Sequence, residues 1–205
     1  DQGNVSLAIG DVKLCTITNT RDTGSLNVHK LTDTDANGVF ESSDDASNLL
    51  GFRWGIGATT DQSFNTAMTG LETGGYDVYE NTVTGYHFYS WYNAADQSKS
   101  CIKPDGFTLP ATINVEKGET TNIVLCNARD TGSLKVKKVV DDSTDLSLWK
   151  FKLNDGGWVD ADSNGLVDFG PQLTGSDYVI TESGPSGYQL GSISGDNCVQ
   201  NTDNT

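Results

Sequence analysis

The sequence is short of positive charge. It contains 13 Lys and Arg residues against 28 Asp and Glu residues, which gives a formal net charge of -15 at pH 7. A surface of this sign repels phosphate backbones and anionic lipid headgroups, so neither nucleic acid nor an anionic membrane is an expected partner. Cations are the expected small ligands.

Long apolar runs and helical patterns are also missing. The sequence has a single Met and no stretch of about 18 consecutive apolar residues, so no membrane insertion is predicted within this chain. Apolar residues alternate with polar ones in short runs, which Gly, Asn, Asp and Thr separate, and helical periodicity is weak throughout. This pattern predicts an all-β fold.

Cysteine is scarce and is not clustered. The four cysteines include no Cys-x-x-Cys pair of the kind that structural zinc sites use, and the two histidines do not supply the missing ligands. The even number therefore favours disulfides in an oxidising, extracellular setting over free buried thiols.

The sequence does contain an internal repeat. Residues 21–30 read RDTGSLNVHK, and residues 129–138 read RDTGSLKVKK. A repeat near the middle of 205 residues predicts two domains of roughly 100 residues each. In each copy a turn leads into an alternating strand, which puts Lys30 and Lys138 on the apolar face of their strands.

The segments that precede the two repeats also match each other. Residues 4–19 can be laid over residues 112–127, and both read as strand, tight turn and strand, followed by Asn-x-Arg-Asp-Thr-Gly-Ser-Leu. The chain is therefore expected to begin with the last hairpin of a neighbouring domain. The predicted organisation is a donor hairpin at 1–20, a first domain at 21–129 and a second domain at 130–205 that lacks its last strands.

Each predicted domain carries an acidic loop with the spacing of an EF-hand-like calcium site. In the first loop the expected ligands surround a turn at Gly38 and are Asp33, Asp35, Asn37, the carbonyl of Val39, Glu41 and Asp44. In the second loop, where Pro171 stands at the closing position, they are Asp160, Asp162, Asn164 and Asp168. An Asx-rich turn in the first loop and an ordinary β-turn in the second are the alternatives.

Further motifs recur in the same order in both domains. Gly-Ser-Leu-x-Val-x-Lys begins each domain, Tyr-x-Val/Ile-x-Glu-x-x-x-x-Gly-Tyr follows at 76–86 and 178–188, and an Asn stands on the last strand of the first domain. These motifs resemble the collagen-adhesin B-type (CnaB) domain, an Ig-like or prealbumin-like β-sandwich found in Gram-positive pilins and surface adhesins. The resemblance covers nearly the whole chain and implies two tandem sandwiches.

The resemblance also implies a covalent crosslink. In the CnaB family a Lys and an Asn often join in an intramolecular isopeptide bond that a Glu assists, and by position these residues are Lys30, Asn127 and Glu80. The alternation supports the same grouping, because all three fall in phase with apolar neighbours and a lone buried charge is costly. A hydrogen-bonded Lys-Glu-Asn cluster without a bond is the alternative.

In the second domain Lys138 and Glu182 occupy the matching positions, but an Asn-bearing last strand is missing. Hairpin 4–19 of another copy would supply that strand, with Asn19 as the partner of Lys138. Cysteine spacing agrees with this arrangement, and it favours two disulfides, Cys101 with Cys126 and Cys198 with Cys15 of the following copy.

Together these features predict a structural unit of an extracellular, cell-surface fibre, either a pilus-like filament or an adhesin stalk. Its partners would be identical neighbouring units, joined head to tail as separate chains or in one tandem-repeat polypeptide. The alternative is an adhesin that binds glycan or a matrix protein through the aromatic run 86–92. An enzyme is not predicted, because Glu80 and Glu182 would act once, on their own chain.

Overall fold

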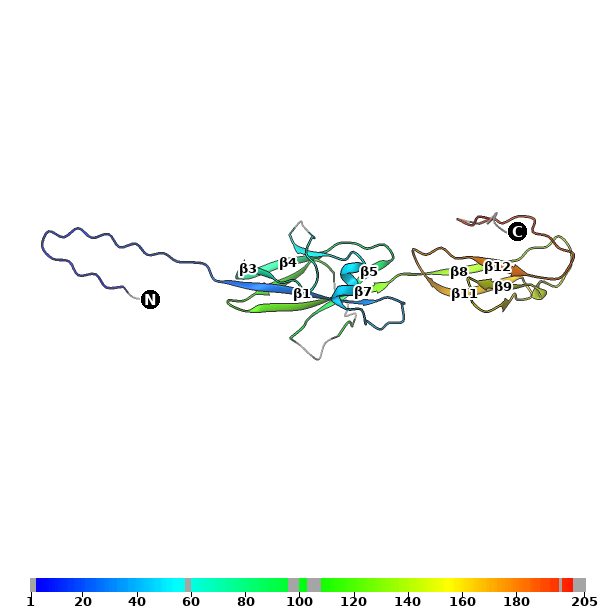
Figure 1. Cartoon of the computed structure of the whole chain (residues 1–205), viewed down its shortest axis with the longest axis horizontal. Coiled ribbons are helices and arrows are strands. Elements are labelled where there is room, and N and C mark those ends of the chain that lie inside the picture. Colours follow the sequence, from blue (N-terminus) through cyan, green and yellow to red (C-terminus); the bar gives the residue numbers. More distant parts are fainter. Residues whose placement is uncertain (1–2, 58–59, 96–99, 103–107, 196, 201–205) are drawn as a thin grey trace. The chain divides into compact units, whose positions relative to one another are not determined.

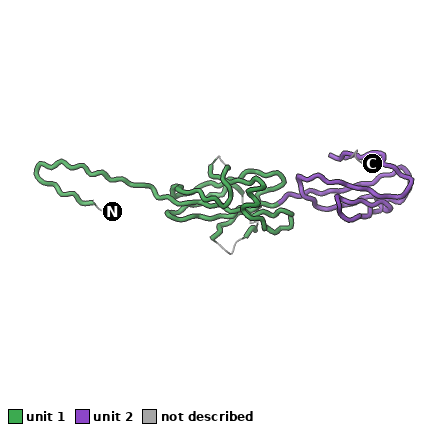
Figure 2. The backbone as a smooth tube through the Cα atoms, in the orientation of Figure 1, with its two compact units in different colours: residues 1–128 green, residues 129–205 purple. Residues whose placement is uncertain are grey.

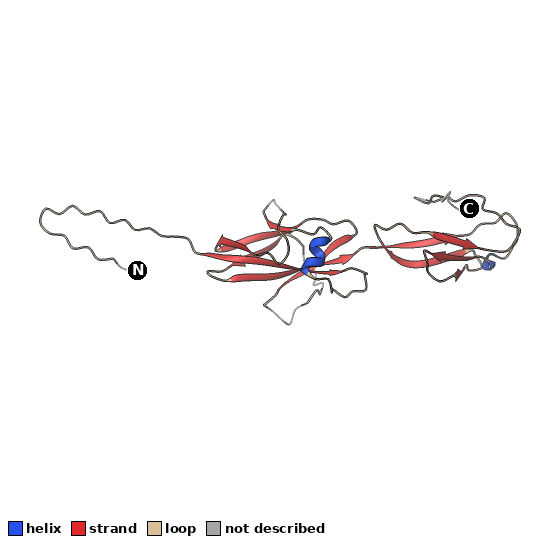
Figure 3. Ribbon diagram, in the orientation of Figure 1, coloured by secondary structure: helices blue, strands red, loops and turns tan. Residues whose placement is uncertain are grey.

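The computed structural model describes residues 3–57, 60–95, 100–102, 108–195 and 197–200. The chain divides into two compact units, residues 1–128 and 129–205 (Figure 2). The regular elements of the described residues are strands, apart from one short α-helix and one 3-10 turn (Figure 3). The predicted all-β fold is confirmed. The ends of the predicted donor hairpin (1–2) and second domain (201–205) lie outside the described residues.

The first unit contains two sheets that share one core (Figure 1). Strands β3, β1, β7 and β5 form one sheet in that order, and β2, β4 and β6 form the other. Their bounds are β1 (Thr23–Asp33), β2 (Trp54–Ile56), β3 (Met68–Glu72), β4 (Gly74–Glu80), β5 (Tyr86–Asn93), β6 (Ala111–Val115) and β7 (Thr120–Arg129). Both sheets contribute buried side chains to the core, among them Leu26, Val28, Trp54, Val78, Val115, Ile123 and Leu125.

Strand β1 carries the first copy of the repeat and lies in the interior of its sheet. It runs antiparallel to β3 and parallel to β7. Every second residue from Gly24 to Thr32 is buried, and Lys30 is only 1% exposed. The parallel pairing sets Lys30 opposite Leu125 and Thr32 opposite Asn127, so Lys30 and Asn127 lie on neighbouring strands.

The α-helix, α1 (Asp44–Leu49), was not indicated by periodicity because it has only 6 residues. The side chain of Ser43 caps it by accepting the N–H of Ala46, and two acidic residues in its first turn, Asp44 and Asp45, complement the positive end of the helix dipole. No helix in the described part of the chain has the length and hydropathy of a membrane span.

The second unit follows part of the same plan. Strand β8 (Thr131–Lys137) pairs with β11 (Leu166–Leu173), and β9 (Lys150–Leu153) lies between β10 (Val159–Asp160) and β12 (Ile180–Ser183). The 3-10 turn η1 (Leu146–Leu148) precedes β9. Four buried side chains form a small core, namely Trp149, Phe151, Ala161 and Val167.

Two strands of the second unit lack, among the described residues, a neighbour that the matching strand of the first unit has. Strand β8 carries the repeat and corresponds to β1, but it is paired with β11 alone, whereas β1 lies between β3 and β7. Strand β12 carries Glu182 and corresponds to β4, but it is paired with β9 alone, whereas β4 lies between β2 and β6. The positions open directly beside β8 and β12 are therefore those of β7 and β6.

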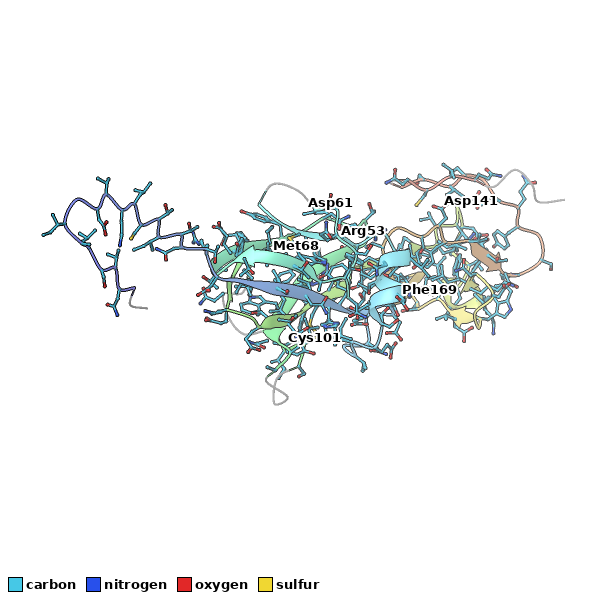
Figure 4. All side chains as sticks on the ribbon, turned by 60° about the vertical axis from the view of Figure 1, so that its left-hand side comes forward. Arg53, Asp61, Met68, Cys101, Asp141 and Phe169 are labelled. Carbon is cyan, nitrogen blue, oxygen red and sulfur yellow. A yellow bond between two sulfur atoms is a disulfide. The ribbon has the colours of Figure 1, made fainter. Side chains whose placement is uncertain are left out.

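Residues 3–22 form no strand in the structure, although the sequence predicts a hairpin there. The predicted turn is present, because the N–H of Asp11 donates to the carbonyl of Ala8 at 3.1 Å and Gly10 has a φ of 90°. The apolar side chains on either side of the turn are exposed (Figure 4): Val5, Leu7, Ile9, Val12, Leu14 and Ile17. An isolated two-stranded hairpin is marginal in water, so these strands need a third strand or a core beside them.

The close approach of the β6–β7 turn to β1 makes Gly24 a testable position. A Cβ at Gly24 would lie 2.1 Å from the carbonyl oxygen of Glu116 and 2.8 Å from Cγ1 of Val115. Because the carbonyl belongs to rigid backbone, we expect Gly24→Ala to destabilise the first unit by about 1–3 kcal/mol. Urea unfolding measures this loss.

Gly132 is the matched control in the second unit. The nearest atom to a Cβ at Gly132 is Cγ2 of Thr174 at 4.0 Å. Gly132→Ala is therefore expected to change the free energy of unfolding by no more than about 0.5 kcal/mol. Equal losses in the two variants would contradict the tight packing of the turn on Gly24.

Candidate functional site

Lys30, Glu80 and Asn127 meet in the core of the first unit. The Lys30 ammonium donates to the Glu80 carboxylate and, at 2.5 Å, to Oδ1 of Asn127. The side chains of Lys30 and Glu80 are 0% and 2% exposed. The structure therefore brings together the three residues for which the sequence predicts an isopeptide site.

Both sheets of the first unit contribute to this site. Lys30 comes from β1 and Asn127 from β7 of the four-stranded sheet, whereas Glu80 is the last residue of β4 in the opposite sheet. Glu80 pairs across the strands with Trp54, which is also buried in the core. The contact therefore spans the core from one sheet to the other.

Burial shifts both ionisable groups toward their neutral forms. Desolvation lowers the pKa of Lys30 to about 8, although the neighbouring Glu80 carboxylate opposes the shift. Desolvation raises the pKa of Glu80, although Lys30 and a hydrogen bond with Asn127 oppose that shift. Because the two pKa values move toward each other, transfer of a proton from the ammonium to the carboxylate becomes less costly. That transfer leaves a neutral amine beside the Asn127 carboxamide.

Sequence reasoning missed the groups that surround Lys30. Its Nζ lies 4.5 Å from the ring centroid of Phe52 and 5.4 Å from that of Phe64, and both rings are buried. Aromatic faces stabilise a cation and exclude water. Trp149, the residue before β9, lies 5.1 Å from Nζ of Lys138, much as Phe52 lies beside Lys30. An aromatic residue just before the corresponding strand in both halves of the sequence was the signal that could have identified Phe52.

The first acidic loop is arranged as an Asx-type turn. Side-chain oxygens of Asp33 and Asp35 accept the N–H of Asn37 at 3.2 Å each, and Asp33 also accepts the N–H of Gly38 at 2.8 Å. The Asn37 side chain in turn accepts the N–H of Val39 at 2.7 Å. These contacts correspond to the Asx-rich alternative.

Asp44, the predicted closing ligand of that loop, is used elsewhere. It accepts the N–H of Lys30 at 2.6 Å and lies 3.0 Å from Nδ1 of His29. Among the described residues no group of three or more His, Cys, Asp or Glu side chains is arranged to hold a metal ion. The predicted ligand Glu41 is therefore not part of such a group either. Calcium binding at this loop stays a prediction from sequence spacing.

The carboxylates of the second acidic loop also contact different partners. Asp160 pairs with Lys150 at 3.1 Å, and Asp168 pairs with Lys135 at 2.8 Å. Asp162 accepts the N–H groups of Asn164 and Leu166 at 2.9 and 2.8 Å, which closes a tight turn at Gly165. Calcium binding here likewise stays a prediction.

The second unit holds a partial copy of the buried site. Nζ of Lys138 lies 2.8 and 2.9 Å from the two carboxylate oxygens of Glu182 and 5.1 Å from the ring centroid of Trp149. Trp149 meets Tyr188 edge-on at 5.0 Å, as Phe52 meets Tyr86 at 5.4 Å in the first unit.

This second site is open where the first is closed. The side chains of Lys138 and Glu182 are 13% and 35% exposed. In the described residues no amide side chain is hydrogen-bonded to Lys138, and its predicted partner Asn19 lies in the exposed segment before β1. The Lys138–Asn19 pairing therefore stays a prediction about neighbouring copies.

The cysteines follow the prediction in part. Cys101 and Cys126 form a disulfide, with their Cα atoms 5.8 Å apart, as the sequence predicts. A disulfide fits a non-reducing compartment. Cys15 and Cys198 are exposed and belong to different units, so their pairing between copies stays a prediction.

Part of the aromatic run on β5 packs inward. Tyr86, Phe88 and Trp91 are partly buried and lie against the core of the first unit. Tyr89 contacts Phe40, with ring centroids 4.9 Å apart and ring planes tilted by 44°. The contacts of Tyr86, Phe88 and Trp91 are those of core side chains.

No family model and no curated protein matches the chain. Among solved structures, the chain is similar to the Bacillus anthracis TIE protein, with a TM-score of 0.48 and 20% sequence identity. The similarity covers 84% of this chain and 30% of that one. At this level it assigns neither a family nor a function.

The buried pair predicts a pH-dependent loss of stability in Lys30→Ala. Asn127→Ala is the reference, because it also lacks a Lys–Asn bond but keeps the ion pair. Removing one partner of a buried ion pair costs about 3–5 kcal/mol of stability. We therefore expect the free energy of unfolding of Lys30→Ala to be lower than that of Asn127→Ala by about this amount.

The sign of the pH dependence follows from Glu80. Burial raises its pKa above 4.5, so the folded state of Lys30→Ala holds that proton more tightly than the unfolded chain. Its stability relative to Asn127→Ala is therefore greatest at low pH and falls as the pH rises from about 4.5 through the raised pKa. Urea midpoints across this range measure the effect, and a constant difference between the variants would contradict it.

Proposed function

We propose that the chain is a structural unit of an extracellular fibre of serially connected β-sandwiches, strengthened by a self-formed isopeptide bond between Lys30 and Asn127. The observation that carries the proposal is the buried contact of Lys30 with Glu80 and Asn127. The resemblance of the sequence motifs to CnaB domains supports the same pairing. The Cys101–Cys126 disulfide supports an extracellular location.

The proposed reaction needs no group beyond these three side chains. The neutral Lys30 amine attacks the carboxamide carbon of Asn127, and a bond forms between that carbon and Nζ. Glu80 passes the proton taken from the amine to the departing amide nitrogen, the original carbon–nitrogen bond breaks, and ammonia leaves. The folded core holds the reacting groups together and excludes competing water, which is the contribution of proximity to catalysis.

The position of this bond suits a chain that carries tension. Strand β1 begins at Thr23 and β7 ends at Arg129, and the two strands are parallel neighbours. A pull along the chain would therefore shear β1 past β7. A bond from Lys30 to Asn127 would pass the load directly between these strands, so residues 31–126 would not be unfolded by it.

The open strand positions of the second unit extend the proposal to a neighbouring unit. Residues 4–19 match the β6–turn–β7 segment, so their first strand would pair with β12 and their second with β8. Asn19 would then lie beside Lys138, as Asn127 lies beside Lys30. The hairpin would come either from a separate chain or from a following repeat of the same polypeptide.

The remaining predictions have less support. Calcium as a stiffening ligand is based on sequence spacing, because the loop carboxylates are engaged in turns and ion pairs. An adhesin that binds glycan through residues 86–92 would need exposed rings, and three of those rings pack against the core. The structural role therefore has the better support.

Intact mass under denaturing and reducing conditions tests the crosslink. The wild-type chain is expected to be lighter than its sequence mass by one ammonia. Lys30→Ala, Asn127→Ala and Glu80→Gln are each expected to have their full sequence mass, because each removes the nucleophile, the acceptor or the proton carrier. Lys117→Ala, which changes an exposed lysine paired with Asp22, should keep the ammonia loss. An unmodified wild-type mass would overturn the proposed bond.

A chain with two copies of residues 1–205 in series tests the link between units. In this chain Lys138 of the first copy and Asn19 of the second can meet, so a further ammonia should be lost beyond the two Lys30–Asn127 bonds. Changing Lys138 to Ala in the first copy should abolish only that extra loss. Retention of the extra loss in this variant would show that another lysine is responsible.

A further inference from the structure

We infer that residues 188–195 are an unformed strand of the second unit, which closes over the second strand of a donor hairpin. The hairpin would then be inserted between β8 and residues 188–195 instead of being added at a sheet edge. This inference rests on the proposed function, because it takes the donor to be residues 4–19 of another copy.

The first evidence is a match between this segment and β5. In the first unit Tyr86–Asn93 form β5, whose neighbour in the sheet is β7. Residues 188–195 repeat the pattern of β5, because Tyr, an apolar residue, Ser and another apolar residue recur at the same spacing: Tyr188, Leu190, Ser192 and Ile193 match Tyr86, Phe88, Ser90 and Trp91. In the second unit these residues are not in a strand.

The segment starts from the same anchor as β5. The ring of Tyr188 meets Trp149 edge-on, as Tyr86 meets Phe52. Beyond this anchor the two segments differ, because Leu190 and Ile193 are 50% and 45% exposed, whereas the matching side chains of β5 lie against the core. The difference is expected if β5 depends on β7 for its backbone hydrogen bonds.

The second evidence is the clearance at Gly132. In the first unit the β6–β7 turn lies directly on Gly24, and two hydrogen bonds hold it there: Gly118 donates to the Thr23 carbonyl at 2.9 Å, and Ser25 donates to the Glu119 carbonyl at 2.8 Å. The repeat places Gly132 at the position of Gly24, yet nothing described lies within 4 Å of a Cβ there except Cγ2 of Thr174. A glycine at this position is required once a hairpin turn docks on it.

The donor carries the features that such docking needs. Gly10 matches Gly118, and both have positive φ, 90° and 71° respectively. The positions of Cys15 and Ile17 match those of Ile123 and Leu125, which are buried in the core of the first unit. The exposed apolar side chains of the donor and those of residues 188–195 would therefore cover one another, which gives the sheet order β11, β8, donor, 188–195.

Insertion would slow the dissociation of the donor hairpin from the second unit. A strand added at an edge can peel away alone, whereas an inserted strand leaves only when residues 188–195 also unfold. Slow dissociation of this kind would hold two units together while the Lys138–Asn19 bond forms.

A synthetic peptide of residues 3–20 with Cys15→Ser tests the inference on the full 205-residue chain. A fluorescent label on the peptide reports binding, and amide hydrogen exchange of the dilute chain reports which segments become protected. We expect protection of β8, of β12 and of residues 188–195. Gly132→Ala is expected to weaken binding by about tenfold or more while its urea unfolding stays that of the wild type. Gly157→Ala, which meets nothing within 4 Å, is the matched control and should bind as the wild type does.

Each other outcome overturns a defined part. Protection of β8 and β12 without protection of residues 188–195 would overturn insertion. It would still agree with binding of the donor hairpin at the sheet edges. Binding to Gly132→Ala as tight as to the wild type would overturn the placement of the turn. No binding at all would overturn both the insertion and the donor. The Lys30–Asn127 bond is judged separately by intact mass, so its failure is distinguishable from these.

Discussion

The burial of the Lys30 ammonium is the constraint on which the first unit depends. A charge in an apolar core is tolerated only with partners, and here the Glu80 carboxylate and the Asn127 amide supply them from two other strands. This requirement brings β1, β4 and β7 together at one level of the sandwich. The same burial shifts the pKa values of Lys30 and Glu80 so that their neutral forms become more accessible, which is the condition that the proposed isopeptide reaction needs.

Each unit contains a Lys–Glu contact beside an aromatic ring, and the two contacts differ in their exposure to solvent. The first holds its Lys, Glu and Asn in a closed core, whereas the second holds Lys138 and Glu182 beside Trp149 in a site that is partly open to solvent. The presence of β6 and β7 in the first unit accounts for this difference in exposure. Where β6 and β7 are present, the lysine is sealed and the turn packs on Gly24; where their positions are open, apolar side chains remain exposed and Gly132 is uncovered.

Several features could not be read from the sequence, for identifiable reasons. Helix α1 is too short to show periodicity, and its capping residues are equally common in turns. Asp44 stands at a calcium-like spacing, but the start of that helix directs it toward the backbone of Lys30 instead. The predicted N-terminal strands are absent because a hairpin needs a neighbouring sheet, and local pattern does not say where that sheet is.

The sequence by itself determined the all-β class, the repeat, the inward-facing phase of Lys30 and the pairing of Cys101 with Cys126. These follow from alternation and spacing, which are local properties of a chain. Only the tertiary structure decided that Lys30 and Asn127 lie on parallel neighbouring strands, that Phe52 faces the ammonium, and that Asp44 accepts the backbone N–H of Lys30. Those facts are settled by how distant segments pack.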